Sequence, residues 1–378
     1  MLARAIAFYL PQYHPIPEND EWWGKGFTEW TNVTRAKPLY KGHRQPNLPA
    51  DLGFYDLRLP EVREQQAALA RAAGIEGFCY WHYWFGNGKK ILERPINEVI
   101  QTGKPDFPFC LCWANASWSG IWYGAPNRIL LEQQYLGEKD YEAFFYDTLP
   151  ALRDPRYIRI EGRPLFIIYH PSKIPDWTVF AATWRRLAEQ EGLGGIYLLG
   201  FESKRREGLD GHAINLPAGF LENGYRGGNP IRQLQRSLHR TRRFVRMRWL
   251  GHPKIQSYEE FIGHIPDTPL PLEEHATVLP NWDNTPRSGQ RGTVYEGATP
   301  GLFARQLRKA ICRVAHKPPE HRLVLIKAWN EWAEGNYLEP DRTFGHGWLE
   351  ACRGELAPLS LHSGQEGTGA PTGQGAPV

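Results

Sequence analysis

The sequence has no apolar run long enough to cross a membrane as a helix, which takes about 18 residues or more. It also opens without a signal-peptide pattern. The first apolar stretch, 5–10, is too short for a signal core, and no cleavage pattern accompanies it. We therefore expect a cytoplasmic protein without a transmembrane segment.

Cysteine is scarce and its spacing is uninformative. There is no CxxC pair, and an odd total of five argues against a framework of disulfides. His14, His82 and His170 show no HxH or HxxxH spacing, so no metal site is predicted. The motifs GxGxxG, GxxxxGKS/T and GxSxG are absent, which leaves dinucleotide binding, P-loop chemistry and serine hydrolysis without support. We expect neither a metal nor a cofactor.

Aromatic residues, in contrast, are abundant: the chain has 15 Trp, 17 Tyr and 17 Phe. This load exceeds what a core needs and indicates surfaces lined by rings. The rest of the composition is that of a globular protein, with 41% hydrophobic and 23% charged residues. The net charge of +4 points to no particular partner.

Eight apolar stretches of strand length alternate with helical patterns along the chain. The strands are predicted at 5–10, 75–84, 107–113, 164–170, 195–201, 213–216, 276–282 and 323–329. The helices are predicted at 61–73, 91–101, 139–152, 177–190 and 300–315. This alternation favours a (β/α)8 TIM barrel over residues 1–358. A doubly wound sheet is disfavoured, because its first turn would carry a Gly-rich phosphate loop.

Two segments depart from this pattern. An insertion at about 219–262 contains nine Lys or Arg and no acid between 226 and 254. It is either a basic amphipathic segment that lies on an anionic membrane surface or holds an acidic glycan, or an ordinary helical insertion with its charges in water. No nucleic-acid motif accompanies the charge, so nucleic acid is not expected. The Gly- and Pro-rich tail at 359–378 is predicted to be disordered.

Polar and aromatic residues recur where the predicted strands end, which is the edge of a barrel that carries catalytic groups. The predicted substrate-binding residues are Tyr9, His82, Tyr83, Trp113, Asn115, His170, Trp282, Asp283, Trp329 and Asn330. Asp283 has an alternative role as the cap of a turn. Glu29, in the aromatic first loop, either touches substrate or pairs with an arginine.

Glu331 and Glu334 are the only close acidic pair at a strand end, and they are flanked by Trp329 and Trp332. Residues three apart share a face if the segment turns helically. Glycoside cleavage needs an acid to protonate the leaving oxygen and a second group to act at the anomeric carbon. Burial against an indole would raise the pKa of one carboxyl into the range of an acid catalyst. The two glutamates are therefore the predicted catalytic residues, with solvated acids on a surface turn as the alternative.

Five segments together resemble the WbsX family: YLPQYHPIPENDEWWGKGFTEWTNV, GFCYWHYWF, WANASW, LPNWDNTPR and IKAWNEWAEGNYLEPD. They are spread from residue 9 to residue 341. The WbsX family in turn resembles glycoside hydrolase family 99, the endo-α-mannosidases. The resemblance implies a (β/α)8 barrel that acts on an α-mannoside-like bond of a bacterial surface polysaccharide or O-antigen.

The resemblance to family 99 also implies a retaining mechanism in which the sugar's own 2-hydroxyl is the nucleophile. The family's two glutamates lie in a WNEWxEG segment, which is 329–335 here. By that match Glu331 is the base on the 2-hydroxyl and Glu334 is the acid/base. WbsX proteins are also named glycosyltransferases of lipopolysaccharide and O-antigen biosynthesis, so a transferase is the first alternative. A non-catalytic glycan-binding barrel is the second.

Overall fold

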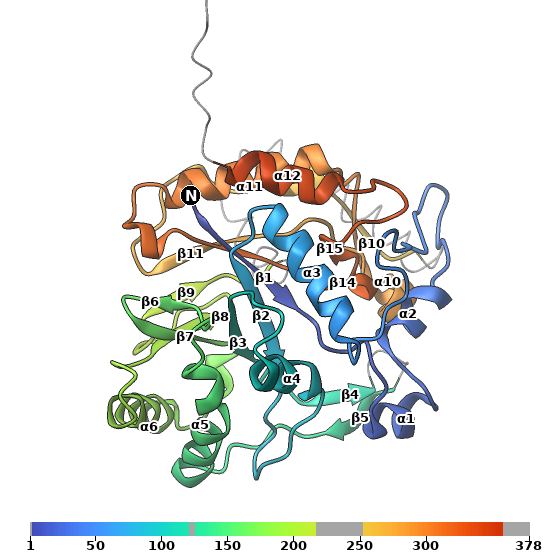
Figure 1. Ribbon diagram of the computed structural model, residues 1–378. Helices are drawn as coiled ribbons and strands as arrows, with labels where there is room; N and C mark the ends of the chain where they lie inside the picture. Colours follow the sequence, from blue (N-terminus) through green and yellow to red (C-terminus); the bar gives the residue numbers. More distant parts are fainter. Residues whose placement is uncertain (1, 121–124, 217–251, 358–378) are drawn as a thin grey trace, which may run out of the picture.

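The computed structural model describes residues 2–120, 125–216 and 252–357, which build a closed barrel of parallel strands (Figure 1). Each strand pairs with the next and the last pairs with the first, which closes the ring. In barrel order the strands are β1 (Arg4–Tyr9), β2 (Gly77–His82), β3 (Phe109–Trp113), β7 (Arg163–Ile168), β8 (Tyr197–Phe201), β9 (Gly211–Ala213), β11 (Glu274–Val278) and β13 (Leu323–Ile326). The predicted (β/α)8 barrel is confirmed.

Helices follow the strands and cover the outside of the barrel (Figure 1). The predicted helices correspond to α3 (Pro60–Ala72), α4 (Arg94–Thr102), α5 (Glu138–Leu152), α6 (Trp177–Gln190) and α11 (Pro300–Val314). Further helices are α1 (Pro17–Trp23), α2 (Glu29–Arg35), α9 (Tyr258–Gly263), α10 (Thr285–Ser288) and α12 (Gly347–Leu356), with 3-10 turns at Pro171–Lys173, Gly289–Arg291, Pro319–His321 and Trp332–Glu334. Short strands are β4 (Trp118–Gly120), β5 (Ala125–Leu131), β6 (Arg159–Ile160), β10 (Lys254–Ser257), β12 (Thr293–Glu296), β14 (Asn330–Glu331) and β15 (Asn336–Tyr337).

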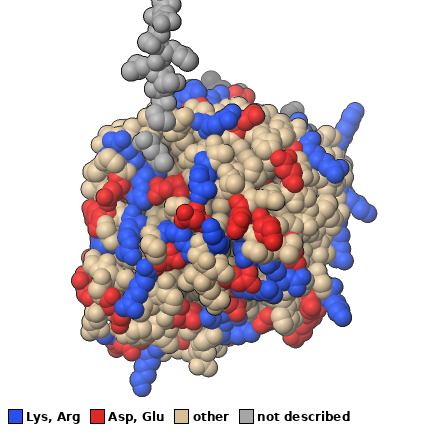
Figure 2. All heavy atoms as spheres, in the orientation of Figure 1, with Lys and Arg blue, Asp and Glu red and all other residues tan. Residues whose placement is uncertain are grey.

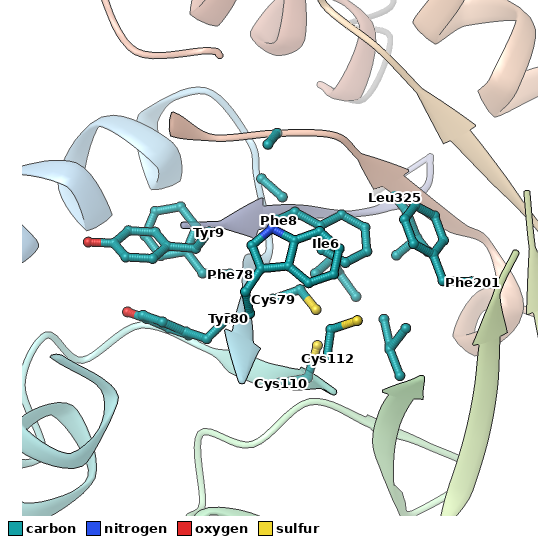
Figure 3. Close-up of a cluster of buried hydrophobic side chains, with 14 of the residues drawn as sticks. Ile6, Phe8, Tyr9, Phe78, Cys79, Tyr80, Cys110, Cys112, Phe201 and Leu325 are labelled. Atoms are coloured by element: carbon teal, nitrogen blue, oxygen red, sulfur yellow. The ribbon is translucent and has the colours of Figure 1, made fainter. Parts of the chain in front are cut away.

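Successive side chains of a barrel strand alternate between the interior and the helix layer. Phe8 packs inside on Trp81 and Phe201, with ring centroids 4.7 and 4.6 Å from its own (Figure 3). Tyr9, the next residue, points the other way and donates its hydroxyl to Gln66 of α3 at 2.7 Å. This alternation decides which residues near the strand ends reach the mouth of the barrel.

The interior of the barrel is apolar and includes free thiols. Cys79, Cys110 and Cys112 lie together on β2 and β3 and are fully buried (Figure 3). Burial raises the pKa of each of these thiols. They therefore act as small apolar side chains, in agreement with their predicted place in buried strands.

Little of the predicted insertion lies within the described residues. Its last part, 254–262, forms β10 and most of α9, and β10 pairs in parallel with β12. Nearly all of the basic stretch 226–254 and the whole tail 359–378 lie outside the described residues. On the face shown in Figure 2, acidic and basic side chains are intermixed. No helix in the described part of the chain is long and apolar enough to span a membrane.

Candidate active site

A cavity of about 240 Å³ lies at the end of the barrel where the strands terminate. Its walls come from the end of β2, from β4 and from the segments that follow β1, β2, β3, β7, β11 and β13. Aromatic lining residues are Trp23, Phe27, Trp81, Tyr83, Trp118 and Tyr169, and charged ones are Glu29, Arg287, Lys327, Glu331 and Glu334. This is the position at which barrel enzymes carry their catalytic groups.

Glu331 and Glu334 reach the cavity because the chain reverses sharply after β13. Strands β14 and β15 pair as a short antiparallel hairpin, and the 3-10 turn Trp332–Glu334 joins them. Gly335 ends the turn with φ +66°, and a Cβ at that position would lie 2.8 Å from the backbone nitrogen of Asp283. Glycine suits both the left-handed backbone and the close approach.

Asn330 ties this hairpin to the first strand. Its side-chain oxygen accepts a hydrogen bond from the backbone N–H of Leu10 at 2.7 Å, and its amide donates to the Leu10 carbonyl at 3.0 Å. The hydroxyl of Tyr13 donates to the carbonyl of Asn330. Because Asn330 is fully buried, these bonds hold the two glutamates in place from behind the cavity.

Arg287 of α10 joins the acids of the cavity. Its Nε lies 2.7 Å from Glu29 Oε1, and its Nη1 lies 2.6 Å from Glu334 Oε1. The same Nη1 is 3.8 Å from Glu331 Oε2, and Lys327 Nζ is 3.7 Å from Glu334 Oε2. None of these side chains is more than 11% exposed, so their charges are poorly screened by water.

Three carboxyl groups face two cations in this cluster, so full ionisation would leave one unbalanced negative charge in a buried site. Burial, together with the charge of Glu334, raises the pKa of Glu331 to about 8. Burial acts to raise the pKa of Glu334 too, but Arg287 and Lys327 outweigh it and hold that pKa below its usual value. At neutral pH the pair therefore holds one proton, which resides on Glu331.

The arrangement can give one proton and take another next to flat aromatic surfaces. Trp81 closes one side and donates its Nε1–H to Glu331 Oε1 at 2.8 Å. In the described part of the chain, no three His, Cys, Asp or Glu side chains are grouped as a metal site. The paired carboxyl groups, one protonated and one ionised, can transfer protons to and from a molecule in the cavity.

Comparison with known proteins identifies the family of the chain. The model of the family described as "Glycosyltransferase WbsX" matches residues 5–352. The chain belongs to the WbsX family. Two curated relatives, each named "Uncharacterized protein WxcX" and from two strains of Xanthomonas campestris pv. campestris, are 41% identical to it over 361 residues. The match covers 94% of this chain and 50% of each relative, so the chain spans about half their length.

Solved structures similar to this WbsX-family chain share its fold. One is a "Glycoside hydrolase-like protein" with a TM-score of 0.56 and 16% identity, covering 94% of both chains. Another is the GH99 endo-alpha-mannosidase from Bacteroides thetaiotaomicron, with a TM-score of 0.51 and 15% identity over 93% of this chain and 96% of that chain. The same enzyme in complex with bis-tris propane gives a TM-score of 0.54.

Three of the residues predicted to bind substrate face the helices and do not line the cavity. Tyr9, His82 and Trp113 are the last residues of β1, β2 and β3, and all three point outward. The ring of His82 stacks on Phe144 of α5, with centroids 5.7 Å apart. Trp113 packs on the same ring at 5.0 Å. These residues were predicted at the mouth of the barrel from their position at the strand ends. Because successive side chains of a strand alternate between the interior and the helix layer, their side chains point away from the cavity.

Tyr83 lines the cavity of this WbsX-family chain, as do the predicted catalytic residues Glu331 and Glu334. Burial and the charge of Glu331 raise the pKa of the Tyr83 hydroxyl, so it stays protonated and can donate a hydrogen bond. Asn115 does not line the cavity. It bonds the backbone of His170 instead, donating to its carbonyl at 2.8 Å and accepting from its N–H at 2.8 Å.

The remaining predicted residues do not line the cavity. His170 has its Nδ1 3.8 Å from Glu202 Oε2. Trp282 lies under Lys327, whose Nζ is 5.0 Å from the ring centroid. Trp329 packs on Phe78 with ring centroids 5.1 Å apart, and Asn330 bonds the backbone of Leu10 as described above. Asp283 accepts bonds from the N–H and hydroxyl of Thr285 at 3.0 and 2.6 Å, which is the arrangement of a turn cap.

Several residues of the site were not predicted from the sequence. Trp81 takes the place beside the glutamates that the sequence assigned to Trp329 and Trp332. Lys327 carried a signal that was available, because a lysine at the end of a buried apolar strand needs a buried acid as its partner. Arg287 carried no such local signal, because its partners Glu29 and Glu334 are distant in sequence. Glu29 pairs with Arg287, which is one of its two predicted alternatives, and it also lines the cavity.

His82 makes the stability of the fold depend on pH. Burial lowers the pKa of its ring from 6.5 to about 4, so between these values the unfolded chain binds a proton that the folded chain excludes. Stability should therefore fall as the pH drops through this window. We expect His82→Phe, which keeps a ring against Phe144, to recover roughly 2 kcal/mol of the stability lost between pH 7 and pH 5.

Urea unfolding of both proteins at pH 7 and pH 5 measures this effect of His82. The exposed His316 provides the matched control, because His316→Phe should leave the pH dependence as it is in the parent protein. Equal losses of stability in the parent protein and in His82→Phe would contradict the assignment.

Proposed function

We propose that this chain is a carbohydrate-active enzyme that cleaves glycosidic bonds of a bacterial surface polysaccharide or O-antigen, with Glu331 and Glu334 as its catalytic residues. The observation that carries the proposal is that both carboxyl groups line one aromatic-walled cavity in unlike protonation states. A pair of carboxyl groups with separated pKa values is what acid and base roles at one bond require. Membership of the WbsX family and a barrel shared with an endo-alpha-mannosidase support the substrate class.

The proposed reaction uses the 2-hydroxyl of an α-mannoside-like sugar as the nucleophile. Glu331 takes the proton of this hydroxyl while its oxygen attacks the anomeric carbon, and Glu334 gives a proton to the leaving oxygen. Water then opens the resulting 1,2-anhydro sugar and passes its proton to Glu334, while Glu331 returns the proton it took to O2 as the C1–O2 bond breaks. The product keeps the anomeric configuration of the substrate.

The protonation state of the free site requires a proton transfer between the two glutamates before this reaction. The pair holds a single proton on Glu331, whereas the reaction starts with that proton on Glu334. Because the two groups are neighbours, one transfer between them prepares the base and the acid together. We propose that a sugar hydroxyl donating to Glu331 drives this transfer, since it stabilises the ionised form of that group.

Glycosyl transfer is the second candidate, favoured by the description of the family model as a glycosyltransferase. The same two carboxyl groups would serve it, with an acceptor hydroxyl in place of water. A nucleotide-sugar donor would bring a diphosphate, and the two cations of the cavity are already paired with Glu29, Glu331 and Glu334. The pairing favours a neutral sugar over a diphosphate at this place.

A substrate screen separates these functions. The purified chain is incubated with aryl α-mannosides and other aryl glycosides, with surface-polysaccharide fragments, and with nucleotide-sugars, and products are followed by NMR. We expect cleavage of a glycoside with retention and no turnover of nucleotide-sugars. Turnover of nucleotide-sugars alone would favour the transferase, and glycan binding without any turnover would favour a binding barrel.

A further inference from the structure

A second cavity, of about 190 Å³, lies at the same end of the barrel. It is bounded by the loop after β1, the loop after β11, strand β12 and the segment that follows β13. It shares no lining residue with the cavity of the glutamates. None of the roles proposed above uses it.

The walls of this second cavity combine rings with neutral polar groups. Tyr40, Phe344 and Trp348 supply aromatic surfaces, and Asn47 and Asn281 supply amides that can both donate and accept hydrogen bonds. Flat C–H faces and several hydroxyls are what such a mixture recognises, and a pyranose ring presents both. The wall chemistry therefore resembles that of the first cavity more than that of an apolar core.

The charges around the second cavity argue against an anionic ligand. Arg44 contributes +1, and Asp283 and Glu296 contribute −2, so the lining carries a net charge of −1. Arg44 also lies over the ring of Phe344, with its guanidinium carbon 5.4 Å from the centroid. A phosphate or an acidic sugar would meet net repulsion, whereas a neutral sugar would not.

The floor of the second cavity is rigidly built. Asp283 is 4% exposed, and its Oδ2 accepts hydrogen bonds from His43 Nε2 and Gln45 Nε2, both at 2.7 Å. His43 Nδ1 accepts from the backbone N–H of Leu39 at 3.0 Å, which places the ring proton on Nε2. Tyr40 stacks on His43 with centroids 4.6 Å apart and planes 5° from parallel. A ligand would therefore meet an ordered surface, which lowers the entropic cost of binding.

The same floor touches the catalytic turn. The backbone N–H of Asp283 donates to the carbonyl of Glu334 at 2.7 Å, and Gly335 packs against the Asp283 backbone. The two cavities are thus separated by one shared wall, so their occupants would lie close to each other.

We propose that the second cavity is a carbohydrate-binding site that takes one neutral pyranose residue while the reacting sugar occupies the first. The inference rests on the proposed function, because it assigns the occupant to the same class of substrate. It adds that the enzyme recognises the polysaccharide at two places, so the enzyme binds a polysaccharide more tightly than it binds a single sugar.

The test closes the second cavity with a bulky side chain. Thr343 is exposed at its rim, so Thr343→Trp should fill it without disturbing the core. Thr268 is also exposed but precedes β11 at the opposite end of the barrel, which makes Thr268→Trp the matched control. Binding of polysaccharide fragments is measured by calorimetry in the Glu331→Gln/Glu334→Gln background, and cleavage of an activated aryl monosaccharide is measured in the active background.

We expect Thr343→Trp to weaken fragment binding by about tenfold and to leave cleavage of the aryl monosaccharide within about twofold of the parent. Thr268→Trp should change neither. Fragment binding that is the same in both variants would overturn the second site. Failure of the parent to cleave any glycoside would instead count against the proposed function, because the binding measurement does not require turnover.

A second experiment tests whether the second cavity binds free monosaccharides or only sugar residues within a polysaccharide. Ala116 lines the first cavity, and Ala116→Trp should obstruct it. Saturation-transfer NMR with methyl glycosides of mannose, glucose, galactose and rhamnose is then compared between Ala116→Trp and Ala116→Trp/Thr343→Trp. A signal lost only in the double variant supports a site that also takes free sugars. If neither variant gives a signal while fragment binding is still weakened by Thr343→Trp, the site takes sugar residues of a polysaccharide but not free sugars.

Discussion

Glu334→Gln should lower the rate of cleavage of an oligosaccharide by about 10³-fold or more, yet slow the release of dinitrophenolate from a dinitrophenyl glycoside in the first turnover by less than about tenfold. The difference follows from the leaving group. A sugar alkoxide must be protonated as it departs, whereas dinitrophenolate is stable as an anion. Glutamine keeps the shape of the side chain but cannot give the proton.

Glu331→Gln should behave differently, with losses of about 10³-fold on both substrates, because no leaving group replaces the base that activates the 2-hydroxyl. Kinetics with both substrates measures the contrast. Glu350→Gln, an exposed position on α12, is the control for the chemical change itself and should keep parent rates. If Glu331→Gln were the variant that spared the dinitrophenyl glycoside, the two roles would be reversed; parent-like rates in both variants would remove the glutamates from the mechanism.

The barrel could be predicted from the sequence because most of its strands carry their own local signal. The sixth is the exception, since it was predicted at 213–216 and lies at Gly211–Ala213. The apolar stretches at 5–10 and 323–329 are short, buried on both faces and followed by polar residues, and parallel strands need no other pattern. The catalytic pair could be predicted for the same reason. Glu331 and Glu334 are neighbours in sequence, so one turn is enough to bring them together.

The support of the site could not be predicted in this way, because it depends on contacts between distant segments. Arg287 joins Glu29 to Glu334 across 258 and 47 residues of sequence. The direction of each strand-end side chain depends in turn on strand register. Trp81 points into the barrel and Tyr9 points out of it, and a shift of one residue would exchange such roles. The positions of the strand ends therefore predict where the cavity lies, but they do not predict which aromatic side chains point into it.

Arg287→Met should raise both pKa values of the glutamate pair and so move the pH profile of kcat/KM to higher pH. In the parent the active form holds one proton, so activity should fall above pH about 8, where the pair loses it, and fall again below the lowered pKa of Glu334. Removing a buried cation leaves three carboxyl groups with Lys327 alone. The cluster should then take up a second proton near neutral pH.

We expect the activity of Arg287→Met to fall by about 10²-fold at pH 7, and part of this loss to be recovered as the pH is raised, because the extra proton blocks the base. Arg287→Lys is the informative control. Lysine keeps the charge, so the pH profile should stay near that of the parent. It cannot hold Glu29 and Glu334 with two separate nitrogens, and kcat should still fall by about tenfold through lost positioning. An unshifted profile in Arg287→Met would mean that burial alone separates the two glutamates, and that the arginine serves only to hold them in place.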